Sequence, residues 1–117
     1  MGKFDSPELV EALENIEKRN YAAAFETLLP LAEAKNPKAQ CNLANLYHFG
    51  WGVRVDGLKA VELYLIVAKQ RIREERLSGI ACQNLATIYT TGLPGVEPDH
   101  EKAREFSNLA KMLGFAM

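Results

Sequence analysis

The sequence predicts an all-α fold in which about three antiparallel helix pairs stack into a right-handed superhelix, a solenoid. Apolar residues recur at the three- and four-residue spacing of amphipathic helices. One stretch also repeats, because Leu43 and Tyr47 match Leu85 and Tyr89, each 42 positions further on. A glycine-containing loop follows each copy, and the second loop is one residue longer. Stacked repeats tolerate insertions in such turns, so the pattern favours a repeat architecture.

The composition is that of a soluble globular protein with a single domain over residues 1–117. The chain has 117 residues, is 48% hydrophobic and 25% charged, and carries a formal net charge of -1. A nearly neutral chain lacks the basic footprint of a nucleic-acid binder. No window approaches the roughly 18 apolar residues of a membrane helix. We therefore expect a cytoplasmic protein with neither a nucleic-acid nor a membrane partner.

The first helix pair is expected over residues 6–36. Ser6 is a typical N-cap and Pro7 suits the first helical position, so the first helix begins here and runs to about Arg19. The alanine-rich stretch that follows has its apolar residues on one helical face. Pro30 lies inside this second helix, where it predicts a kink.

The second pair is expected over residues 37–78. Asn36 is a suitable N-cap for a helix that runs to about Phe49, and Asp56 or Gly57 begins its partner after the glycine loop. The chain then departs from the repeat, because the step to the next pair is six residues longer than the step before it.

The extra residues belong to the segment from Lys69 to Gly79, which is rich in Arg, Glu, Gln and Leu. These residues favour helices, so we expect the second helix of this pair to be extended to about Arg76 and to stop near Ser78 and Gly79. Its alternating charges indicate either a solvated helix face or a protrusion that docks a partner.

The third pair is expected over residues 79–117, with a helix that begins at Asp99 after the second glycine loop. The chain ends on "KMLGFAM", in which Leu113, Phe115 and Met117 are apolar. Terminal repeats normally need a polar outer face. End-to-end dimers would bury this C-terminal edge, so a homodimer is one expectation.

The glycines of the two loops raise the question of a phosphate cradle. Cradles of this kind follow a strand and open a helix, whereas these glycines follow a helix. A glycine in that place is typical of a left-handed C-cap before a tight reversal. We therefore interpret the repeated glycines as structural: Gly50, Gly52, Gly92 and Gly95.

The repeated residues resemble the Sel-one-like repeat family, relatives of the tetratricopeptide repeats. The first copy carries the pattern on Ala39, Leu43, Ala44, Tyr47, Gly50, Gly52, Val53, Asp56, Ala60, Leu63, Tyr64 and Ala68. The second carries it on Ala81, Leu85, Ala86, Tyr89, Gly92, Gly95, Val96, Asp99, Ala103, Phe106 and Ala110. Residues 6–36 look like the degenerate opening unit that often precedes such repeats. The resemblance implies a solenoid that scaffolds complexes.

The sequence offers few groups for catalysis or metal binding. Its two histidines, His48 and His100, have no nearby nucleophile or carboxylate motif. Cys41 and Cys82 lack CxxC spacing, so we interpret them as free thiols rather than as a disulfide or metal ligands. We therefore expect no enzyme, no metal and no cofactor.

The first helix of each pair is expected to line a concave surface. Taking 100° per residue, we predict that its outward positions form a line of binding residues: Glu11, Asn15, Lys18, Cys41, Asn45, His48, Gln83, Thr87 and Thr90. Their amides and hydroxyls suit a peptide backbone, although polar residues also keep a surface soluble. Trp51, at a loop tip, either packs over the turn or anchors a partner.

The function predicted from these features is a non-enzymatic adaptor or scaffold that binds a protein or peptide on its concave surface. One alternative is an inhibitor or immunity-type protein that blocks an enzyme or toxin by tight binding. A second alternative is a self-assembling repeat module.

Overall fold

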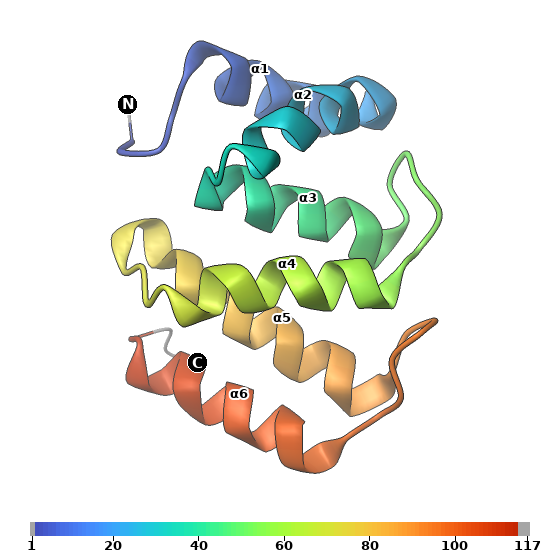
Figure 1. Ribbon diagram of the computed structural model, residues 1–117, viewed down its shortest axis with the longest axis vertical. Helices are drawn as coiled ribbons and strands as arrows, with labels where there is room; N and C mark the ends of the chain where they lie inside the picture. The colour runs from blue at the N-terminus through green and yellow to red at the C-terminus, as the bar shows by residue number, and fades with distance from the viewer. Residues whose placement is uncertain (1, 115–117) are drawn as a thin grey trace.

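The computed structural model describes residues 2–114, which form six α-helices stacked in antiparallel pairs (Figure 1). The helices are α1 (Pro7–Glu17), α2 (Tyr21–Glu33), α3 (Pro37–Phe49), α4 (Gly57–Lys69), α5 (Leu77–Thr91) and α6 (His100–Met112), with a 3₁₀ turn, η1 (Glu74–Arg76), before α5. Each helix packs against the next one along the chain. The predicted all-α stack of three pairs is confirmed. No helix within residues 2–114 has the length and apolar character needed to cross a membrane.

Four of the helices begin at the residues that the sequence marks as caps. The side chains of Ser6, Asn36, Asp56 and Asp99 accept hydrogen bonds from backbone N–H groups in the first turns of α1, α3, α4 and α6. These bonds satisfy N–H groups that have no partner within the helix.

The core consists of two adjoining clusters rather than one centre. The first joins α1, α2 and α3 through Leu9, Ala12, Leu28, Ala32, Ala39, Leu43 and Leu46. The second joins α3 to α6 and includes Tyr64, Val67, Leu85 and Ile88. Tyr47 and Leu63 pack against both clusters. Each pair therefore packs on its neighbours as well as within itself, as in other stacked repeats.

Each glycine loop docks on the start of the second helix of the preceding pair. A Cβ on Gly52 would lie only 2.9 Å from the Tyr21 carbonyl carbon at the start of α2. In the next repeat, the Gly57 N–H at the start of α4 donates to the Pro94 carbonyl oxygen at 2.9 Å. The loops thus join successive pairs, which supports the structural interpretation of their glycines.

The prediction of an extended α4 is wrong. This helix ends at Lys69, the chain turns through left-handed backbone at Arg71 (φ 52°), and α5 begins at Leu77. The Ser78 hydroxyl accepts the Ile72 N–H at 2.6 Å and lies 2.6 Å from the Val67 carbonyl oxygen, to which it donates. Helix propensity is a weak preference, and these tertiary hydrogen bonds override it.

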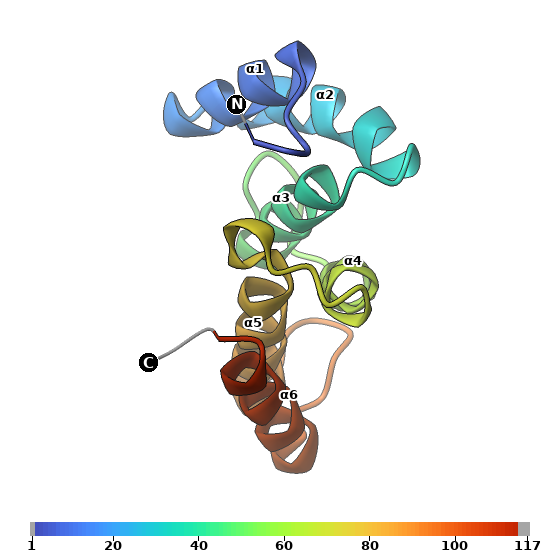
Figure 2. The same cartoon turned by 90° about the vertical axis from the view of Figure 1, so that its left-hand side faces the viewer.

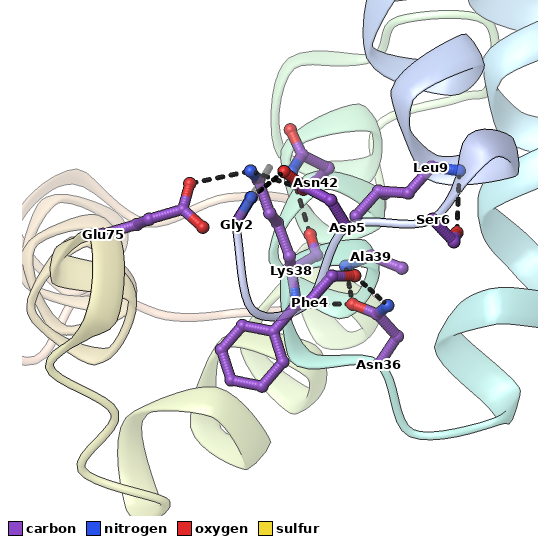
Figure 3. A network of polar contacts seen from close by, with 10 residues as sticks. All are labelled: Gly2, Phe4, Asp5, Ser6, Leu9, Asn36, Lys38, Ala39, Asn42 and Glu75. Carbon is purple, nitrogen blue, oxygen red and sulfur yellow. Dashed lines mark hydrogen bonds and ion pairs between the residues drawn. The ribbon is translucent and has the colours of Figure 1, made fainter.

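The N-terminal segment ties this turn to α3 (Figure 3). The Lys38 ammonium lies 2.9 Å from Asp5 Oδ1 and 2.7 Å from Glu75 Oε1, and the Asn36 amide donates to the Phe4 carbonyl oxygen at 2.8 Å. Burial opposes the charged form of Lys38, but the hydrogen bonds to Glu75 and Asp5 outweigh burial and raise the Lys38 pKa. The same Lys38 contact lowers the Asp5 pKa, helped by the Gly2 N–H.

The outer side of α6 is mostly polar, although Met112 in its last turn is 69% exposed. Glu101, Arg104, Glu105 and Lys111 are exposed on this helix, and Leu113 is buried. Phe115 and Met117 lie outside the described residues. This helix itself supplies the polar outer face that was expected to be missing. The described part of the C-terminal edge therefore gives no support to a homodimer.

Candidate interaction surfaces

The predicted line of binding residues is only partly on the surface. Cys41 and His48 are buried, with 3% and 8% of their surface exposed, so their assignment to an open surface is wrong. Asn15, Asn45 and Gln83 are half-buried, whereas Glu11, Lys18, Thr87 and Thr90 are exposed. The error arises because α3 packs against α2, α4 and α5, which leaves only a narrow part of its surface free.

The side of α3 that is not fully buried is a stripe of Lys38, Asn42, Asn45 and Phe49, and α5 repeats it with Ile80, Asn84, Thr87 and Thr91. The Lys38 end of this stripe is covered, because Asp5 and Glu75 bind its ammonium group. Each residue of one set lies 42 positions from its counterpart, so the two sets occupy the same helical positions. We call these eight residues the α3–α5 stripe. Around the helix axis, its centre lies about 60° from that of the predicted line. The asparagines that recur at positions 42 and 84 are the sequence signal for which side of α3 and α5 is not fully buried.

Asn42 and Asn84 have the same geometry on their helices. The Asn42 Nδ2 donates to the Lys38 carbonyl oxygen at 2.8 Å, and the Asn84 Nδ2 donates to the Ile80 carbonyl oxygen at 3.1 Å. Each amide is thereby held along its helix. In the part of the chain that is described, each Oδ1 has no hydrogen-bond partner and is available as an acceptor.

Asn45 is fixed by a buried network. The Tyr64 hydroxyl donates to Asn45 Oδ1 at 2.5 Å and lies 3.1 Å from His48 Nδ1. Because the single hydroxyl proton is given to Asn45, the His48 Nδ1–H must donate to the Tyr64 oxygen. Burial lowers the His48 pKa and raises the Tyr64 pKa, so both groups stay neutral near pH 7. His48 therefore positions Tyr64 and Asn45.

We expect Tyr64→Phe to lower the free energy of unfolding by about 1–3 kcal/mol, because it leaves the Asn45 and His48 groups without their partner. Urea unfolding measures this loss. Tyr89→Phe is a matched control, since Tyr89 is also buried but its hydroxyl makes no hydrogen bond within residues 2–114. Equal losses in the two variants would show that the network does not stabilise the fold.

Trp51 packs over the turn. Its ring stacks on Tyr21, with ring centroids 5.2 Å apart, and on Phe49, with centroids 4.9 Å apart. The indole is half-buried, whereas Phe49 is 49% exposed at the end of the α3–α5 stripe. A role for Trp51 as an anchor for a partner stays a prediction.

The cysteines and histidines do not converge on a reactive site. Cys41 and Cys82 are free and buried, and burial raises their pKa to about 12 and about 11. The thiols are therefore neutral and poorly nucleophilic. His100 is exposed at the start of α6. Within residues 2–114, no group of three or more His, Cys, Asp or Glu side chains is placed to hold a metal ion.

A groove that the sequence did not reveal lies between α2 and α4, with α3 as its floor, and has a volume of about 250 Å³. In Figure 2, α2 and α4 lie to the right of α3. Leu29, Leu43, Leu63 and Ile66 line the groove together with the buried Gln40. The Gln40 Nε2 donates to a carbonyl oxygen of α2 at 3.3 Å, and its Oε1 is buried without a partner in the described residues.

Comparisons with known proteins agree with this architecture. The family model of the Sel1 repeat matches residues 37–71 and 79–115. A protective antigen of uropathogenic Escherichia coli with an SLR fold superposes with a TM-score of 0.77 and 30% identity over 92% of this chain, although the match spans only 22% of that antigen. A Sel1 repeat protein from Oxalobacter formigenes superposes with a TM-score of 0.68 over 96% of this chain and 95% of its own. Its identity is 18%, which shows the fold alone.

No curated protein matches the chain. Sel1 repeat proteins are generally protein-interaction scaffolds and are typically non-catalytic. With its helix pairs, its docked glycine loops and two matched repeats, the chain belongs to the Sel1 repeat family.

Proposed function

We propose that this protein is a non-enzymatic adaptor that binds a peptide or protein segment along the α3–α5 stripe. The observation that carries the proposal is the pair Asn42 and Asn84, which occupy equivalent positions and hold their amides in the same way. Each presents an unused acceptor to the N–H groups of a bound backbone. Asn45, whose Oδ1 is occupied by Tyr64, keeps its Nδ2 as a donor for a backbone carbonyl.

The mechanism is the presentation of a surface that already exists. The hydrogen bonds of Asn42, Asn45 and Asn84 fix these side chains before a partner arrives. Binding then loses little side-chain entropy, and immobilising each flexible side chain would otherwise cost about 0.5–1.5 kcal/mol. The exposed Phe49 ring adds apolar area at one end of the stripe.

Glu11, Asn15 and Lys18 would extend the same surface onto α1, where Glu11 and Lys18 are exposed and Asn15 is half-buried. Glu11 and Lys18 are charged, whereas the stripe residues on α3 and α5 other than Lys38 are neutral. In this proposal, the residues on α1 select among the side chains of the partner, whereas the asparagines of the stripe contact the backbone of the partner.

Affinity capture with this chain as bait tests the proposal. We expect a stoichiometric partner that is lost from the triple variant Asn42→Ala, Asn84→Ala, Thr87→Ala while circular dichroism shows unchanged helix content. The matched control is the triple variant Asn20→Ala, Thr27→Ala, Asn108→Ala. It removes two amides and one hydroxyl as well, but from the residue before α2, from α2 and from α6. Loss of the partner from both variants, or from neither, would contradict binding on the stripe.

An inhibitor or immunity-type protein would use the same kind of surface. The captured complex distinguishes it from an adaptor, because an inhibitor abolishes a measurable activity of its partner and an adaptor leaves that activity intact.

A further inference from the structure

The basic residues of this chain gather at one end of the stack, although the formal net charge is only -1. This end is on the left in Figure 1 and faces the viewer in Figure 2. It contains the N-terminal segment, the turn between α4 and α5, and the last turn of α6. Five exposed cations lie here and are called the basic end: Lys69, Arg71, Arg73, Arg76 and Lys111.

The parts of the basic end are close in space. The position of a Cβ on Gly114, just after α6, lies 3.9 Å from Arg73 Nη1. The charge of Arg71 acts on Cys82 in α5. The turn between α4 and α5 therefore brings its arginines next to the ends of α5 and α6.

Carboxylates in the same turn do not neutralise these cations. Glu74 pairs with Lys3 at 3.2 Å, and Glu75 pairs with Lys38 at 2.7 Å. Both carboxylates are thus directed to lysines of the N-terminal segment and α3. None of the five cations of the basic end forms an ion pair within residues 2–114.

Helix stability explains some of these cations but not all. Lys69 and Lys111 lie in the last turns of α4 and α6, where a positive charge favours the helix dipole. Arg76 is different, because it is the N-cap of α5, where a positive charge is unfavourable and the first turn carries no acidic residue. Its backbone is also left-handed (φ 58°), a conformation that glycine or asparagine adopts at lower cost.

The turn is held firmly despite this cost. Ser78 bonds it to α4 through Val67 and to the turn itself through Ile72, and the Glu74 and Glu75 pairs attach it to the N-terminal segment and α3. Strained backbone that the surrounding contacts maintain is often found at functional positions. Here it places Arg73 and Arg76 at the surface with both guanidinium groups uncommitted.

We propose that the basic end binds an acidic peptide segment of a partner protein, with Arg73 and Arg76 as the main contacts. Guanidinium groups bind carboxylates through two parallel hydrogen bonds, which suits Asp and Glu side chains. A polypeptide fits better than a nucleic acid, because phosphates that continue past this small end would meet the Asp and Glu residues that number 15 in the chain. The site uses other residues than the α3–α5 stripe, so each of the two proposals can fail without the other.

Fluorescence anisotropy at physiological ionic strength tests this inference. The probe is a short fluorescein-labelled peptide of alternating Glu and Gly. We expect saturable binding in a one-to-one ratio, and a dissociation constant that rises at least about tenfold in Arg73→Gln, Arg76→Gln. The matched control is the double variant Arg54→Gln, Arg104→Gln. It removes the same amount of charge from the glycine loop between α3 and α4 and from the middle of α6, and we expect it to bind the peptide like the wild type.

Three further probes decide between ligand classes: a Gln and Gly peptide of the same length, a single-stranded oligothymidine, and vesicles that contain phosphatidylserine. Absence of saturable binding by the acidic peptide would overturn the inference, as would equal weakening in the two double variants. Tighter binding of the oligonucleotide or of the vesicles would overturn it in favour of a nucleic acid or a membrane surface.

Discussion

Leu28→Ala is expected to lower the free energy of unfolding by about 2–5 kcal/mol, the usual cost of a cavity at a fully buried leucine. Leu28 has no exposed surface and lies in the cluster that joins α1, α2 and α3. Guanidinium unfolding measures the loss. Leu58→Ala serves as the control, since Leu58 is 62% exposed and should lose less than about 0.5 kcal/mol.

The same variant should affect the chain unevenly. Because the core consists of two clusters, protection of backbone amides against hydrogen exchange should fall most in α1 and α2 and least in α5 and α6. An equal loss of protection in all six helices would contradict the division of the core and would indicate a single cooperative unit.

Gly52→Ala is expected to destabilise the fold by about 2–5 kcal/mol. Its left-handed backbone (φ 77°) costs an alanine roughly 1–2 kcal/mol, and the new Cβ would collide with backbone atoms of Tyr21 and Ala22 at 2.9 and 3.0 Å, which adds about 1–3 kcal/mol. Thermal unfolding followed by circular dichroism gives the difference from wild type.

Gly95→Ala separates the two causes. Gly95 occupies the equivalent place in the next repeat and is also left-handed (φ 87°). Its Cβ would lie 3.2 Å from the side chain of the exposed Leu58 and 3.7 Å from the Leu58 backbone N, the latter an ordinary contact. We therefore expect only the cost of the left-handed backbone, about 1–2 kcal/mol. If the two variants lose equal stability, docking of the loop on α2 does not hold the first pair to the second.

Much of the fold follows from local signals in the sequence. Ser6, Asn36, Asp56 and Asp99 mark helix starts because their short polar side chains satisfy N–H groups that the helix leaves open. The repeat of 42 residues places equivalent helices in equivalent surroundings, so the stack follows from the pattern. These features depend on neighbouring residues or on the repeat, and both are visible in the sequence.

The turn between α4 and α5 could not be predicted in this way. Its residues favour a helix, but Ser78 bonds to Val67 and Ile72, while Glu74 and Glu75 bind lysines 71 and 37 positions away. Only the folded chain brings these partners together. Together, these hydrogen bonds and ion pairs outweigh a preference for helix of a few tenths of a kcal/mol per residue.

The predicted binding line coincides only in part with the surface that the stack leaves open on α3 and α5. Asn45 and Thr87 belong to both the predicted line and the observed stripe, whereas Cys41 and His48 are buried. An isolated repeat unit does not show how deeply the next pair covers it. The contact of α3 with α5, which narrows the free surface, arises only in the stack.

The most direct test of the account is NMR of the ¹⁵N-labelled chain during titration with its captured partner, observing the side-chain amide groups. We predict shifts at Asn42, Asn45 and Asn84, on the α3–α5 stripe, and no shift at Gln40, in the groove between α2 and α4. Shifts at Gln40 with the three asparagines unchanged would contradict the account and would place the partner in the groove.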